Sequence, residues 1–234
     1  MGKKPLILHL ETATEICSVS LSSGTELIAK EEIANGFSHA EHLLPLAEKV
    51  LKSCTLQAQE LDAIALSEGP GSYTGLRIGA STAKGLCYAL EIPLIAISTL
   101  ESIARGAQKE ISEGNALLCP MIDARRMEVF TTLYTANFEQ KEEIRAEVVD
   151  ENSFQNILAE NHVIFCGNGM PKCQKLLQKS PNAIFSFAPL SSCNMIIPAL
   201  KKFEEKQFED VAYFEPFYLK NYIAKKSTVK GLYD

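Results

Sequence analysis

Apolar and polar residues alternate with a period of two along the first part of the chain. Leu6 to Leu10 predicts a short strand that ends at Glu11. The next run, ICSVSLS, places its apolar residues on one face and its serines on the other. After the turn SSGT, the stretch ELIAKEEIA continues the pattern. We therefore expect three consecutive strands joined by turns.

The period changes to that of a helix in FSHAEHLLPLAEKVLKSC. Ser38, followed three residues later by Glu41, has the pattern of a capping box and predicts a helix start. Pro45 removes a backbone donor in the second turn, so we expect a kink or a later start. The apolar stripe at helical spacing consists of Leu43, Leu46, Ala47, Val50 and Leu51.

A glycine-punctuated loop and a helix of small residues follow the next apolar strand, Leu61 to Ser67, in EGPGSYTGLRIGASTAKGLCYA. Gly75, Gly79 and Ala83 recur every four positions and so share one helix face. A stripe of small side chains lets another backbone approach closely. We expect the same chain, a ligand or another protein to pack there.

The second half of the chain repeats the order of the first. GNALLCPMIDARRMEVFTTLY predicts a strand that ends at Asp123, a tight turn and further strands, as the opening does around Glu11. Helix, strand and helix patterns follow in both halves. We predict an α/β fold of two lobes, residues 1–110 and 111–234, each a mixed sheet flanked by helices, with a tail that packs back on the first lobe.

The composition limits the functional classes. Of 234 residues, 46% are hydrophobic and 22% charged, which is ordinary for a globular protein. The net charge of −6 argues against a protein that grips nucleic acid by itself. The chain lacks an apolar run of the roughly 20 residues that span a bilayer, and its start is too short for a signal peptide. We therefore expect a cytoplasmic protein without membrane contact.

The seven cysteines are odd in number and contain no C-x-x-C pair. Most lie within apolar runs. This pattern favours buried free thiols over a disulfide framework or a zinc site.

The string GPGSYTGLRIGASTAKGLCYAL, with FSHAEHLLP before it and MIDARRMEVFTTLY after it, resembles the TsaB (YeaZ) family. Members are bacterial accessory subunits for making N6-threonylcarbamoyladenosine at position 37 of tRNA. The ending PFYLKNYIAKK is similar to the family's usual end, so the resemblance covers most of the chain; Tyr73 stands where the family more often has Phe. The resemblance implies two ribonuclease-H-like lobes of the actin, Hsp70 and sugar-kinase type.

The resemblance also implies that this chain has no catalytic residue, metal or cofactor of its own. The catalytic paralogue, TsaD, holds a metal with an H-x-x-x-H pair on one helix face. Here Thr99 and Ile103 stand at those positions, and isoleucine cannot ligate a metal. We expect His39, near a helix start, to be a surface or capping residue, and His9 to be a core residue.

Two enzymatic alternatives remain open. We expect a vestigial nucleotide site at Glu11, Gly69, Gly71, Ser72 and Asp123. In a stand-alone nucleotide-dependent enzyme of the actin-kinase class, this site would be functional. Against it, the turns TATE and ARRM contain no glycine. A glycoprotease-like hydrolase is the other alternative, but SEGPGSYTG is not G-x-S-x-G. We favour a tight connection in which Ser72 or Thr74 caps the helix.

The resemblance implies a TsaD-like catalytic subunit as partner, with a TsaE-like ATPase in the same complex. We expect a homodimer when the chain is alone, and we expect this chain to meet tRNA only indirectly, as part of the complex. Within that complex, the groups that would touch tRNA are lysines of the tail: Lys220, Lys225, Lys226 and Lys230. The predicted partner-binding residues lie on two helix faces: Leu43, Leu46, Ala47, Val50, Gly75, Leu76, Gly79, Ala80 and Ala83.

Overall fold

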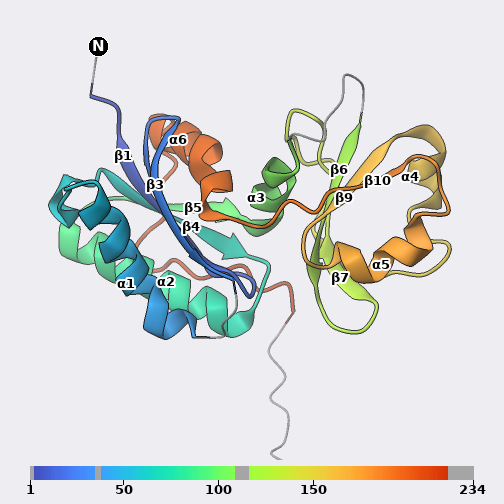
Figure 1. Cartoon of the computed structure of the whole chain (residues 1–234), viewed down its shortest axis with the longest axis horizontal. Helices are drawn as coiled ribbons and strands as arrows, with labels where there is room; N and C mark the ends of the chain where they lie inside the picture. Colours follow the sequence, from blue (N-terminus) through green and yellow to red (C-terminus); the bar gives the residue numbers. More distant parts are fainter. Residues whose placement is uncertain (1–2, 35–37, 109–115, 221–234) are drawn as a thin grey trace, which may run out of the picture.

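The computed structural model describes residues 3–34, 38–108 and 116–220. They form two lobes that lie side by side (Figure 1). The predicted lobe boundary at residue 110 and the tail lysines Lys225, Lys226 and Lys230 lie outside the described residues.

The first lobe is built on a five-stranded mixed sheet in the order β3-β2-β1-β4-β5. Its strands are β1 (Leu6–Glu11), β2 (Cys17–Ser23), β3 (Glu26–Ile33), β4 (Ala63–Gly69) and β5 (Leu94–Ser98). The first three run antiparallel, and β4 and β5 run parallel to β1. The predicted opening of three strands is confirmed.

Two helices, α1 (His39–Ser53) and α2 (Tyr73–Leu90), cover one face of this sheet, and a 3₁₀ turn, η1 (Ala58–Glu60), precedes β4 (Figure 1). The helix α1 starts where the sequence predicts and contains Pro45. The capping box is wrong, because the Ser38 side chain makes no cap hydrogen bond. Its backbone, at φ −101° and ψ 47°, lies outside the extended conformation that usually aims a capping side chain at the first turn.

The second lobe repeats this topology in the order β10-β9-β6-β7-β8. Its strands are β6 (Leu117–Asp123), β7 (Glu128–Thr131), β8 (Arg145–Val148), β9 (Val163–Cys166) and β10 (Ala183–Phe185), with helices α4 (Gln155–Glu160) and α5 (Met170–Leu177). The fold class predicted from the sequence, two mixed sheets flanked by helices, is confirmed. The three-residue strand β10 is too short to show a period and was not predicted.

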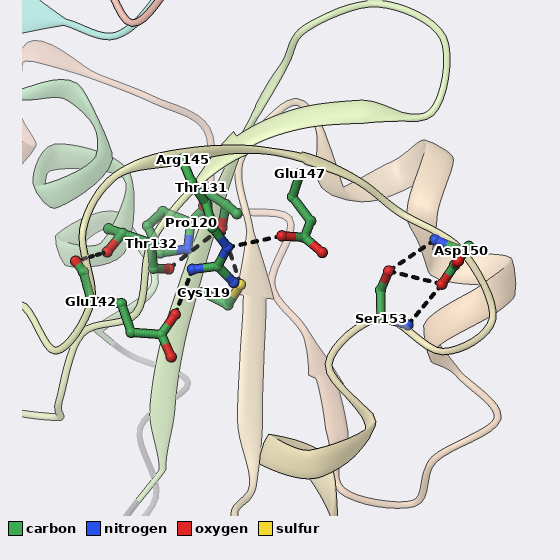
Figure 2. Close-up of polar contacts among 9 residues, drawn as sticks. All are labelled: Cys119, Pro120, Thr131, Thr132, Glu142, Arg145, Glu147, Asp150 and Ser153. Carbon is green, nitrogen blue, oxygen red and sulfur yellow. Dashed lines mark hydrogen bonds and ion pairs between the residues drawn. The ribbon is translucent and has the colours of Figure 1, made fainter.

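Ion pairs hold the outer edge of the second sheet. The Arg145 guanidinium binds Glu142 and donates from Nε to Glu147 Oε2 at 2.8 Å (Figure 2). Thr132 Oγ1 donates to the Glu142 carbonyl at 2.6 Å, which ties the long connection before β8 to the sheet. Charged side chains on an edge strand also discourage pairing with another chain.

The last helix of each half packs on the sheet of the other half. The helix α3 (Thr99–Gly106) follows β5 but lies against β6 of the second lobe as well as β4 and β5. In return, the 3₁₀ turn η3 (Ser192–Met195) and α6 (Ile196–Glu204) pack on β1 of the first lobe, and α6 also packs on β5 (Figure 1). This exchange joins the lobes through two apolar clusters, one around Ile103 and one around Met195.

Candidate functional site

The structure corrects the predicted docking face. All nine expected partner-binding residues are buried, the most exposed side chain being Leu46 at 7%. They are Leu43, Leu46, Ala47 and Val50 on α1, and Gly75, Leu76, Gly79, Ala80 and Ala83 on α2. The apolar stripes cover the sheet of the same lobe, so core packing accounts for them.

The turn after β1 fills the small-residue stripe of α2. A Cβ atom at Gly75 would lie 2.1 Å from the Thr12 carbonyl oxygen, and one at Gly79 would lie 2.4 Å from Thr12 Oγ1. The same hydroxyl donates to the Gly75 carbonyl at 2.9 Å. The sequence left open whether the same chain, a ligand or another protein packs on this stripe. In the structure, the same chain packs on it.

The opposite face of α2 carries a second row of mostly short side chains, and this row is exposed. It consists of Thr74, Arg77, Ser81, Gly85 and Tyr88. A Cβ atom at Gly85 would meet no other atom of the described residues within 4 Å. On the neighbouring α1, Leu44 is 49% exposed. Another helix could approach closely at Ser81 and Gly85, because little side chain stands in the way. We name this row the α2 ridge.

A cavity of about 1120 Å³ lies between the lobes. It is lined by the turn after β1, the glycine loop, the β6–β7 turn and residues 217–220. Of the predicted nucleotide-site residues, Gly71, Ser72 and Asp123 line this cleft, whereas Glu11 and Gly69 do not. The structure thus brings together only part of that set.

The glycine loop is occupied by its own chain. A Cβ atom at Gly69 would lie 2.4 Å from the Phe217 carbonyl oxygen, and one at Gly71 would lie 2.5 Å from that of Ala13. The Ser72 amide donates to Ala13 at 2.7 Å, while Ser72 Oγ accepts from the Gly75 amide at 3.3 Å. The prediction that Ser72 caps the helix is confirmed, and two amides near the start of α2 already have partners.

The two strand-end carboxylates are in different states. Glu11 is fully buried, and its Oε1 accepts from the Ala13 amide at 2.7 Å and from Ser67 Oγ at 2.9 Å. Burial raises the pKa of Glu11 to about 7, more than these hydrogen bonds lower it. Partial burial would also raise the pKa of Asp123, but hydrogen bonds from Lys172 and the Arg125 amide bring it below its ordinary value. Asp123 is ionised and paired with Lys172 at 2.5 Å.

Thr99 and Ile103, which the resemblance matches to metal ligands of the catalytic paralogue, are built into the core. Thr99 is buried, and its Oγ1 accepts from the Gly69 amide at 3.1 Å. Ile103 is buried in the cluster between the lobes, where its Cγ2 would lie 3.0 Å from a Cβ atom at Gly167. Neither side chain fits a metal.

The histidines do not supply a metal site either. His9 is a buried core residue, as expected, with Nε2 at 2.9 Å from Ser22 Oγ and a pKa that burial lowers to about 3. His39 is not the predicted surface or capping residue, because it is buried and its Nε2 lies 2.8 Å from the Thr14 carbonyl. Within the described ranges, no three His, Cys, Asp or Glu side chains are grouped as a metal site requires.

A C-terminal strap, residues 214–220, runs along the cleft and was not predicted as part of a site. The Phe217 amide donates to the Glu68 carbonyl at 2.8 Å. The Tyr218 ring lies 5.1 Å from that of Tyr73, between centroids. Lys220 pairs with Glu128 of the second lobe at 2.6 Å. The only signal in the sequence was the aromatic and basic character of PFYLK, which does not identify a contact.

All seven cysteines are free, and five of them are buried, which confirms the buried thiols. Among the helices of the described residues, none combines the length and the apolar character needed to cross a membrane.

Comparison with known proteins gives a consistent family. Residues 32–231 match the family model described as TsaD, tRNA N6-adenosine threonylcarbamoyltransferase. The tRNA threonylcarbamoyladenosine biosynthesis protein TsaB of Escherichia coli K12 is 30% identical over 229 residues, which cover 94% of this chain and 96% of that protein. The protein of the same name from Haemophilus influenzae is 28% identical over 94% of this chain and 95% of its own length.

Solved structures share the fold. YeaZ from Pseudomonas aeruginosa superposes with a TM-score of 0.76 at 24% identity, covering 92% of this chain and all of that one. An activator of 2-hydroxyisocaproyl-CoA dehydratase from Clostridium difficile, solved with bound ADPNP, gives 0.51 at 11% identity over 86% of this chain and 97% of its own. At these identities the likeness concerns the two-lobed fold alone.

Proposed function

Because the chain belongs to the TsaB family, we propose that it is a non-catalytic subunit that binds and activates a TsaD-like threonylcarbamoyltransferase. The product would be N6-threonylcarbamoyladenosine in tRNA, made in the cytoplasm with a TsaE-like ATPase in the same complex. The observation that carries the non-catalytic role is Ile103, an apolar core residue at a position where the paralogue has a metal ligand.

We propose that the partner docks on the α2 ridge and the adjoining exposed side of α1. Tyr88 is 83% exposed and Leu44 is 49% exposed, so apolar surface is available on both helices. Short side chains at Ser81 and Gly85 would let a partner helix pack closely. A second copy of the chain is proposed to use the same surface when the partner is absent.

Gly85→Arg is expected to weaken docking by about thirtyfold or more while leaving the fold intact. The new side chain points into open space on the ridge, so it obstructs a partner without touching the lobe. A buried, unpaired charge at an interface costs at least about 2 kcal/mol, or roughly a thirtyfold loss of affinity. The measurement is titration calorimetry with the TsaD-like subunit, together with the mass of the chain alone by light scattering.

The matched control is Gly85→Ala, which keeps the ridge low and should bind as the unaltered chain does. If Gly85→Arg binds the partner with unchanged affinity, the proposed surface is wrong. Reconstituted tRNA modification tests the function itself: the TsaD-like subunit should need this chain for full activity. A chain that modifies tRNA without any TsaD-like subunit would overturn the non-catalytic role.

A further inference from the structure

The β6–β7 turn presents two adjacent arginines in an unusual backbone conformation. Arg125 and Arg126 have φ of +72° and +46°, and the turn is closed by bonds of 3.0 Å between Ala124 and Glu128 and between Glu128 and Arg125. Glycine and asparagine are the usual residues at such positions, because a Cβ atom disfavours positive φ. Both arginines are exposed, and neither side chain forms a hydrogen bond or a salt bridge within the described part of the chain.

Other cations and two aromatic rings gather around this turn. Arg125 lines the same cleft as Lys220, Tyr73 and Tyr218. Arg77 donates to the Tyr73 hydroxyl at 3.2 Å and lies 5.4 Å above that ring. The groups that line the cleft thus come from both lobes and from the strap, while Arg77 lies beside the cleft, on Tyr73.

The carboxylates at this mouth already have partners. Asp123 pairs with Lys172 at 2.5 Å, and Glu128 pairs with Lys220 at 2.6 Å. Glu15 accepts a hydrogen bond from Asn168 at 2.9 Å. Lys172 and Lys220 are thereby paired with carboxylates, and Glu215 beside Tyr218 adds one more negative charge. Arg125 and Arg126 are therefore the cations at this mouth whose side chains have no hydrogen-bonded or ion-paired partner among the described residues. The whole chain, in contrast, carries a net charge of −6.

We propose that the mouth of the cleft binds the phosphodiester backbone of an RNA strand. Arg125, Arg126 and Lys220 would contact phosphates, and the rings of Tyr73 and Tyr218 would contact a base. Cationic grooves combined with aromatic rings are the usual means of binding single-stranded nucleic acid. The acidic remainder of the surface would repel RNA and so confine the contact to this place. The inference rests on the proposed function, in which tRNA is the substrate of the complex.

A free nucleotide is a poorer fit than a strand. The amides of Ser72 and Gly75 are already bonded, and the hydrogen atoms of Gly69 and Gly71 lie against carbonyl oxygens. Glu11 is buried behind the loop, and Asp123 is paired with a lysine. The described residues that line the cleft therefore form no open phosphate cradle, whereas the exposed cations at its mouth suit a strand that passes across it.

The test is tRNA binding by the double variant Arg125→Ala/Arg126→Ala, both as the full chain and in complex with a TsaD-like subunit. Fluorescence anisotropy with labelled tRNA should show an affinity about tenfold lower. The slope of log K against log salt should fall in magnitude by about 1.4, since each contact with a single-stranded phosphate contributes about 0.7. Arg125→Lys/Arg126→Lys should restore most of both values. Lys141→Ala/Lys201→Ala removes two exposed cations that do not line the cleft and is the control.

Three results separate this inference from the proposed function. If the alanine variant forms the complex and binds tRNA with unchanged affinity and salt slope, the RNA site is wrong and the proposed function stands. If ATP at micromolar concentration displaces the RNA, the cleft is a nucleotide pocket and the RNA site is wrong. If the unaltered chain binds no TsaD-like subunit but shows the expected salt slopes, the RNA site stands and the proposed function is wrong.

Discussion

Gly75→Ala is expected to lower the free energy of unfolding by about 3 kcal/mol, the upper part of the range for overpacked cores. The added Cβ atom would lie 2.1 Å from the Thr12 carbonyl oxygen. That oxygen belongs to the backbone, so no side-chain rotation can relieve the clash. Moving the turn away would also strain the hydrogen bond from Thr12 Oγ1 to the Gly75 carbonyl, at 2.9 Å.

The matched substitution on the same helix has the opposite sign. The added methyl group of Gly85→Ala meets no atom within 4 Å in the part of the chain that the structure describes. Alanine favours a helix over glycine by roughly 0.8–1 kcal/mol, so this variant should be more stable. Urea unfolding followed by circular dichroism measures the free energy of unfolding of both variants, Gly75→Ala and Gly85→Ala. Two changes of equal sign and size would show that Thr12 does not fill the stripe on α2.

Glu11→Gln is expected to raise the free energy of unfolding by about 3 kcal/mol at pH 8 and to leave it nearly unchanged at pH 4.5. Burial raises the pKa of Glu11 from 4.5 to about 7. Its contribution to stability is therefore complete below pH 4.5 and is lost as the pH rises through 7, when the buried carboxyl must ionise. Glutamine resembles the neutral acid at every pH, so the two proteins should diverge as the pH rises.

His9 changes the stability with pH in the opposite direction, over a pH range that overlaps that of Glu11. Burial lowers its pKa from 6.5 to about 3, so its contribution is present above pH 6.5 and is lost as the pH falls through 3. Between pH 4.5 and 6.5 the free energy of unfolding falls with pH because of Glu11 and rises with pH because of His9, so the two slopes cancel in the unaltered protein. In Glu11→Gln the His9 slope of about 1.4 kcal/mol per pH unit should appear alone.

Urea unfolding at half-unit intervals from pH 4 to 8 measures this difference. Glu160→Gln, at an exposed glutamate on α4, removes the same charge far from the core and is the control. Parallel curves for Glu11→Gln and the unaltered protein would mean that Glu11 is not buried as an acid in the native state.

Local patterns predicted the elements of this fold well. The period of two in ICSVSLS predicted β2. The strands that end at Glu11 and at Asp123 predicted that the second lobe repeats the order of the first. The faces of α2 could not be assigned, because short residues occur on both: Gly75 and Gly79 face inward, and Ser81 and Gly85 face outward. The inward face is identified only by the hydrogen bond between Thr12 and Gly75, which lie 63 positions apart in the sequence.

The candidate site depended even more on contacts between distant residues. A carboxylate at the end of a strand looks alike in sequence at Glu11 and Asp123, yet the first is buried and the second is exposed. The strap pairs Lys220 with Glu128, which are 92 positions apart. The period of a local sequence pattern cannot predict a contact between residues so far apart. The adjacent arginines of ARRM are visible in the sequence, but their backbone conformation is not, nor is the absence of a salt bridge to them from residues 3–34, 38–108 and 116–220.

The exchange of α3 and α6 between the lobes has a consequence for biosynthesis. The face of the first sheet that carries Ile7, Ala65 and Ile97 is covered by Met195 and Ala199. During translation this apolar face must stay open until α6 has left the ribosome, although N-terminal domains usually fold first. A fragment that ends at residue 108 should aggregate when expressed alone, and adding residues 190–206 in trans should restore its solubility. A nascent chain of this protein is therefore expected to depend on chaperones until almost all of it has been made.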